Sequence, residues 1–118
     1  MARWQQSRYG AYARDVLDTT PLTRAVDHFA DRLRAAPQSR LQRGAAAEAL
    51  GLARALALRA QVLEDPSGEP REMPDAGMFA AADQVMVAGH DLAVVLSSDA
   101  ELADALRLVE EAQKRAGV

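Results

Sequence analysis

Two long segments, residues 39–64 and 75–97, are rich in alanine and would be apolar around most of their circumference as helices. Alanine occurs 26 times in the 118 residues, whereas aromatic and β-branched residues are scarce. This composition favours helix over sheet. A helix that is apolar on most sides is usually central in its fold. The two segments are therefore predicted to form the core of an all-α protein.

Further helices are expected over residues 2–17, over residues 21–36, and from Ser98 to Gly117. Ser98 and Glu101 have the spacing of a capping box, and Gly117 suits a helix C-terminus. Short connections between consecutive helices favour antiparallel neighbours. We therefore predict one domain, residues 1–118, folded as an up-and-down bundle of four to five helices. Its centre is predicted to be a long antiparallel hairpin formed by residues 39–64 and 75–97.

The net charge of −3 hides an uneven distribution of charge along the chain. Residues 1–59 carry a net charge of +5, and residues 60–118 carry −8. Either basic and acidic helices pair inside one bundle, or the basic half is a face for nucleic acid or an acidic partner. The abundance of alanine, with 13 arginines and one lysine, is typical of a GC-rich bacterial genome.

The chain contains no cysteine, which excludes disulfides and thiolate metal sites. Its start lacks the apolar segment of a signal peptide, and charged residues interrupt every apolar run below the roughly 18 residues of a membrane span. We therefore expect a cytoplasmic protein with no membrane partner. No phosphate-binding glycine loop or framed nucleophile is present, and we expect no cofactor.

The leading functional hypothesis is a non-enzymatic domain that binds protein, first of all a second copy of itself. Trp4, Tyr9 and Tyr12 concentrate interface-favoured side chains in the first predicted helix. Gly44 and Gly51 lie on a face of small residues that another helix could approach closely. Short covering helices cannot bury both long apolar helices completely, so a homodimer is predicted to cover the rest.

An alternative hypothesis is a DNA-binding helix-turn-helix within residues 40–60. A turn at Gly51 would let Arg54 and Arg59 enter a major groove, with Arg40 and Arg43 near phosphates. The surrounding alanines favour one continuous helix instead, and no capping residue follows Gly51. Nucleic acid is therefore not the expected partner.

A second alternative is a metal site or a metal-dependent hydrolase built from the two histidines. His28 and Asp31 lie three residues apart on one helix face, while Asp83, His90 and Asp91 share the polar stripe of a later helix. Imidazoles and carboxylates together would suit Zn, Mn or Fe if the two helices were adjacent. The ordinary interpretation is that these side chains form local hydrogen bonds on the surface.

Overall fold

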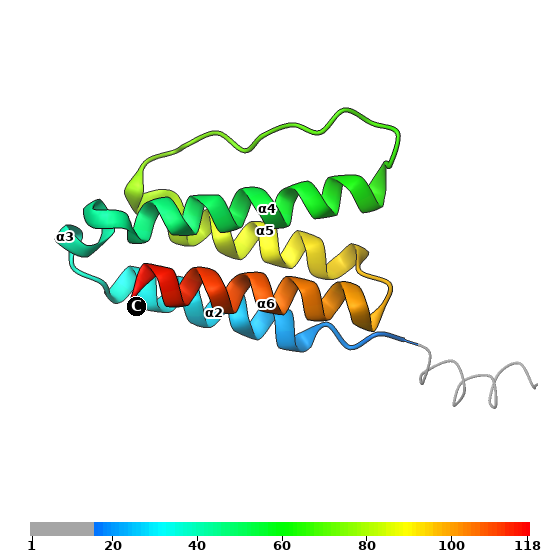
Figure 1. Cartoon of the computed structure of the whole chain (residues 1–118), viewed down its shortest axis with the longest axis horizontal. Coiled ribbons are helices and arrows are strands. Elements are labelled where there is room, and N and C mark those ends of the chain that lie inside the picture. Colours follow the sequence, from blue (N-terminus) through cyan, green and yellow to red (C-terminus); the bar gives the residue numbers. More distant parts are fainter. Residues whose placement is uncertain (1–15) are drawn as a thin grey trace, which may run out of the picture.

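The computed structural model describes residues 16–118, in which four long helices lie side by side (Figure 1). They are α2 (Thr20–Ala35), α4 (Ala46–Glu64), α5 (Ala81–Val95) and α6 (Asp99–Ala116). Three short elements join them, namely α3 (Gln38–Arg40), η2 (Leu41–Ala45) and η3 (Met78–Ala80). The described part contains helices and no strand, which confirms the predicted all-α class. The helix predicted over residues 2–17 falls almost entirely outside the described residues.

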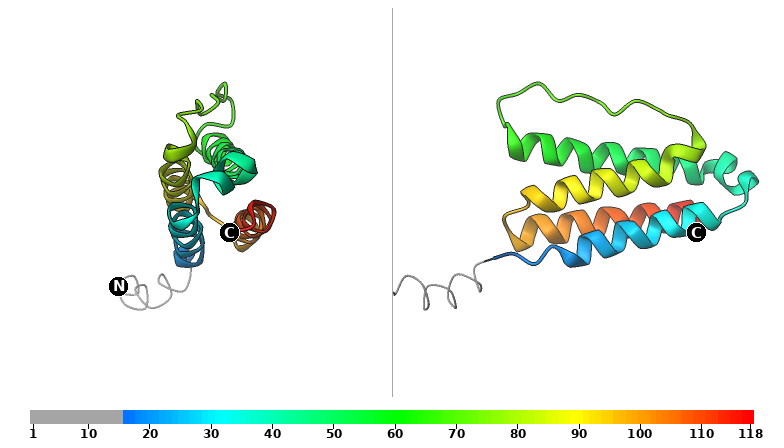
Figure 2. Two further views of the ribbon diagram at one scale, coloured as in Figure 1. Left: turned by 90° about the vertical axis from the view of Figure 1, so that its left-hand side faces the viewer. Right: turned by 180° about the vertical axis from the view of Figure 1, so that it is seen from behind.

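Seen along their axes, the helices occupy four corners, with α5 and α2 on one side and α4 and α6 on the other (Figure 2). Each helix packs on its two neighbours around this ring. Arg34 of α2 pairs with Asp83 near the start of α5, and Asp27 pairs with His90 further along α5. These contacts run in opposite directions along the two helices, so α2 is antiparallel to α5.

The two central helices, α4 and α5, run parallel to each other (Figure 1). The first turns of both helices line one surface depression, and the last turns of both line another. The predicted antiparallel hairpin of residues 39–64 and 75–97 is therefore wrong. The parallel direction is possible because the 13-residue connection, residues 65–77, returns along the whole length of α4 (Figure 1). Such a segment can span roughly 40 Å when extended, which exceeds the length of about 28 Å expected for the 19 residues of α4.

The predicted helix over residues 39–64 is also interrupted near its start. Gly44 has φ 153° and ψ −20°, which are not helical values, and α4 begins only at Ala46. A residue with a side chain rarely adopts this conformation, so a glycine is needed at the bend. The bend turns the chain from α3 into α4 at one end of the bundle.

The last helix forms as its sequence predicts. The Ser98 hydroxyl accepts a hydrogen bond from the Glu101 amide at 3.1 Å, and the Glu101 carboxylate accepts one from the Ser97 amide at 2.8 Å. Gly117 ends the helix in the left-handed conformation, with φ 71°. The Ser98 cap and the terminal glycine are confirmed, while the return hydrogen bond of the capping box goes to Ser97, one residue before the cap.

The core is rich in alanine, which contributes 12 of the 23 buried apolar residues among residues 16–118. Helices with small side chains can approach one another closely. One such close approach occurs where Gly89 of α5 faces Val26 of α2. A Cβ atom added to Gly89 would lie 2.5 Å from Val26 Cγ1 and 2.7 Å from Cγ2, both far inside van der Waals contact. The two methyl groups crowd the same position, so rotating Val26 would not relieve the overlap.

We expect Gly89→Ala to lower the free energy of unfolding by about 1–3 kcal/mol, because overpacking forces α2 and α5 apart. Chemical denaturation in dilute solution measures this. The matched control is Gly51→Ala, since Gly51 is exposed on α4 with nothing within 4 Å of its added Cβ. The control should gain up to about 1 kcal/mol from helix propensity. Equal effects of the two substitutions would contradict the close approach of the helices.

Candidate functional site

One side of α4 faces solvent and carries no charged side chain. Helical spacing places five residues on it, and we call them the α4 outer face: Ala47, Gly51, Ala55, Leu58 and Val62. Leu58 is 44% exposed and Val62 is 45% exposed, although both are large and apolar. The opposite side of the helix, which includes Ala49, Leu52 and Leu56, is buried in the core. The core therefore uses one side of this nearly apolar helix and leaves the other uncovered.

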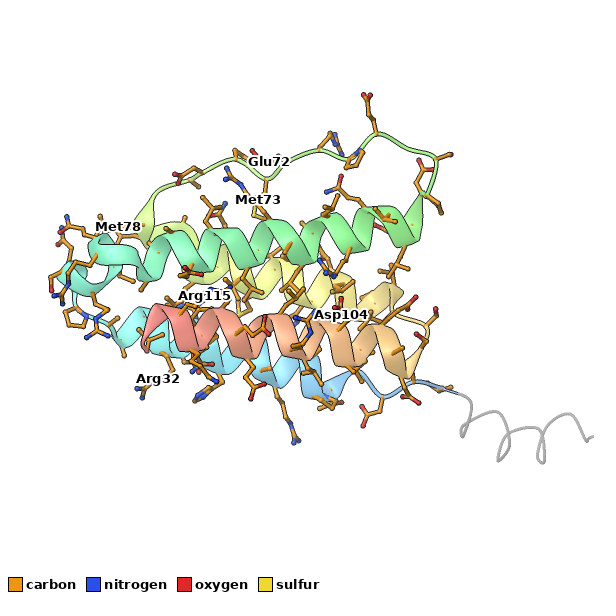
Figure 3. All side chains as sticks on the ribbon, viewed as in Figure 1. Arg32, Glu72, Met73, Met78, Asp104 and Arg115 are labelled. Atoms are coloured by element: carbon orange, nitrogen blue, oxygen red, sulfur yellow. The ribbon has the colours of Figure 1, made fainter. Side chains whose placement is uncertain are left out.

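Ion pairs with α6 form one edge of the α4 outer face. Arg59 Nε lies 2.6 Å from Asp104 Oδ2, and Arg115 Nε lies 2.9 Å from Glu48 Oε1. Asp104 and Arg115 lie along α6 on the side toward α4 (Figure 3). The charged side chains at this edge therefore point toward α6 and do not lie over the apolar face.

The connection between α4 and α5 forms the other edge. We call residues 70–74 the strap, because they run along α4 in an extended conformation, with Glu72 and Met73 above the helix in the view of Figure 3. Gln61 holds the strap by two hydrogen bonds, accepting from the Arg71 amide at 2.7 Å and donating to the Arg71 carbonyl at 2.9 Å. Arg54 Nε donates to the Met73 carbonyl at 2.8 Å. The strap is therefore fixed to α4 through its backbone.

The carboxylate of Asp104 is the centre of the ion pairs on α6. Arg59 and Arg107 both donate hydrogen bonds to it, at 2.6 Å and 2.7 Å. These two hydrogen bonds, with that from Arg59 the stronger influence, lower the pKa of Asp104 below its ordinary value. The ionised carboxylate of Asp104 is therefore the form that pairs with Arg59 and links α6 to α4.

The outward side of α5 and the η3 turn before it also expose large apolar side chains, but charged groups divide this surface. Phe79 is 73% exposed on η3, and Val87 and Val94 are exposed on α5, Val94 to 83%. Between and beside them lie Asp83 and His90, which pair with α2, and the exposed Asp91. The segment Met78–Val95 is long and apolar enough to span a membrane by length and composition, and 39% of it is buried in the bundle. Core helices of soluble proteins meet the same criterion, so this segment does not by itself indicate a membrane.

The structure brings the two histidine-bearing helices together, but not the predicted metal ligands. Asp31 and Asp83 are both paired with Arg34, at 3.3 Å and 2.6 Å. His90 Nε2 lies 2.8 Å from Asp27, the acid that precedes His28 in the sequence. His28 faces the groove between α2 and α6, and Asp91 lines the depression beside the strap. Within residues 16–118, no group of three or more potential ligands is positioned to hold a metal ion.

The helix-turn-helix alternative required a turn at Gly51, and the structure has none there; the continuous helix favoured by the surrounding alanines is observed. α4 continues without a break from Ala46 to Glu64, since a single exposed glycine costs a helix only about 1 kcal/mol. Arg54 and Arg59 bind the strap and α6 rather than projecting together. Arg40 donates to the Gly117 carbonyl at the end of the bundle. Arg43 is exposed beside it on η2.

Among the predicted partner-binding residues, Gly51 lies at the centre of the small-residue part of the α4 outer face. Gly44 lies at the bend before α4 instead, where its role is conformational. Trp4, Tyr9 and Tyr12 lie outside the described residues. Sequence reasoning missed Leu58 and Val62 as site residues. The sequence does contain a sign of their position. They follow Ala47, Gly51 and Ala55 at intervals of three or four residues, which places all five on one face of the helix.

Comparison of the chain with protein-family models, with curated proteins and with solved structures finds no match. The function must therefore be argued from the site itself.

We expect the stabilisation contributed by Asp104 to disappear in acid. Its folded-state pKa is lowered, so its contribution is present above the unfolded value of about 3.9 and is lost as the pH falls through the folded value. Asp104→Asn should therefore cost less than about 1 kcal/mol at neutral pH and nothing well below pH 4. Denaturation of both proteins across this pH range measures the difference.

The matched control is Glu110→Gln on the same helix, because the structure gives Glu110 no ion-pair partner among residues 16–118. A cost for Asp104→Asn that stays constant into acid would contradict the role of its charge.

Proposed function

We propose that this protein is a non-enzymatic interaction domain that binds a second copy of itself through the α4 outer face. The observation that carries the proposal is the exposure of Leu58 and Val62 on a face without charge. Contiguous apolar surface of this kind, bordered by polar groups, is characteristic of protein-binding sites. Gly51 and two alanines on the same face allow the backbone of another helix to come close.

The arrangement of the edges supports the choice of α4 over α5. On α4, the neighbouring charges are bonded to α6 or to the strap and lie beside the face. On α5, Asp83 and His90 lie on the exposed surface itself, and a partner covering Val87 would have to desolvate them. Taking charged groups out of water costs free energy even when they remain paired. On α4, the charged groups nearest the face, Arg54 and Glu72, pair with each other at its edge beside the strap.

The association is expected to be weak and reversible. Leu58 and Val62 are already half-buried, so covering the rest in both copies contributes only a few kcal/mol. That gain opposes the loss of translational and rotational freedom on association. Contacts along the α6 edge and the strap must supply the rest of the binding free energy. We expect a dimer that forms at micromolar or higher concentration and acts in the cytoplasm, in keeping with a chain that lacks cysteine.

We expect Leu58→Glu to abolish self-association, because it places a charge at the centre of the apolar face. Light scattering coupled to size exclusion should show the wild-type mass rising toward that of a dimer as the concentration increases, and the variant staying monomeric. The matched control is Val94→Glu, which puts the same charge on the most exposed apolar residue of α5. A wild-type protein that stays monomeric, or a control that dissociates equally, would contradict the proposal.

A further inference from the structure

The α4 outer face has two unlike halves. Ala47 and Gly51 make its first half small, whereas Leu58 and Val62 make its second half large. The halves are evenly placed about the midpoint between residues 54 and 55. Gly51 and Leu58 each lie about 5 Å from this midpoint along the helix, and Ala47 and Val62 each lie about 11 Å from it. Each small residue therefore has a large counterpart at the same distance on the other side.

We infer that the second copy docks with its α4 antiparallel to the first, about a two-fold axis that passes close to Ala55. This inference rests on the proposed function and specifies its geometry. A two-fold contact uses the same surface on both copies, so the surface must be complementary to itself. In the antiparallel arrangement, Leu58 of each copy lies over Gly51 of the other. Val62 of each likewise lies over Ala47 of the other.

Gly51 has the space to receive such a side chain. Nothing lies within 4 Å of the position that a Cβ atom would take there. A parallel arrangement would instead set Leu58 against Leu58 and Gly51 against Gly51. The two glycines would then leave a gap, and an unfilled gap forfeits the dispersion contacts on which close packing depends. Size complementarity thus favours the antiparallel direction.

The charges at the α6 edge follow the same symmetry. Glu48 lies at this edge beside the small half, and Arg59 lies at the same edge beside the large half. A two-fold axis perpendicular to α4 and lying in the contact plane keeps the α6 edges of the two copies together while reversing the helix direction. It therefore brings Glu48 of each copy toward Arg59 of the other, which is an attractive pairing. At the α6 edge, charge therefore favours the same partner as size does, a second copy of this chain.

The absence of cysteine from the sequence allows a direct test by disulfide cross-linking. Gly51→Cys and Leu58→Cys are made as separate single-cysteine variants of the full chain, mixed in equal amounts, and oxidised. Intact mass spectrometry separates the three possible disulfide dimers, because their masses differ. A disulfide requires Cα atoms within about 7 Å of each other. In the antiparallel dimer, only positions 51 and 58 of opposite copies meet this condition, since two copies of position 51 lie about 10 Å apart along the helix.

We expect the mixed disulfide between positions 51 and 58 to exceed clearly the half of the total that random pairing produces. The control is Val94→Cys mixed with either variant, which should give no excess over random pairing. A predominance of 51–51 and 58–58 disulfides would overturn the antiparallel geometry while leaving self-association through α4 in place. Cross-linking no greater than that of the Val94 control, together with a monomeric wild type, would overturn both proposals.

Discussion

The close approach of α2 and α5 at Gly89 is the contact on which the rest of the structure depends. A methyl group at Gly89 would lie 2.5 Å from Val26, so nothing larger than hydrogen fits between the helices. Alanine fills much of the remaining core, and residues 16–118 contain no buried polar side chain. The polar and charged side chains of the described domain therefore all lie at least partly exposed to solvent.

The parallel direction of α4 and α5 determines which surface is left uncovered. Because the chain must return along α4 before α5 begins, the connection becomes a strap bonded to Gln61 and Arg54. The strap covers the groove between α4 and α5, and α6 covers the other side of α4. The strip that remains between them is the α4 outer face. An antiparallel hairpin would have needed no strap, and the face would have had different edges.

Much of the fold could be predicted from local signals, because they act within a few residues. The helix predicted over residues 21–36 is observed as Thr20–Ala35, and the caps of α6 form as expected. The direction of α5 could not be predicted, since a 13-residue connection allows either choice. The bend at Gly44 could not be predicted either, because an isolated glycine is also tolerated within a helix. In α4, the apolar pattern on all sides identifies a central helix but does not show which side its neighbours cover. The spacing of Leu58 and Val62 places them on the face of Gly51 and Ala55, but it does not show that this face is the one left exposed.

The central claim, that a second copy covers the α4 outer face, is tested most directly by NMR. Amide chemical shifts recorded from micromolar to millimolar protein would locate the surface that changes on association. The account predicts concentration-dependent shifts confined to residues 47–62 and to the adjoining residues of α6 and the strap. Shifts confined to the exposed side of α5, or no shifts across this range, would contradict it.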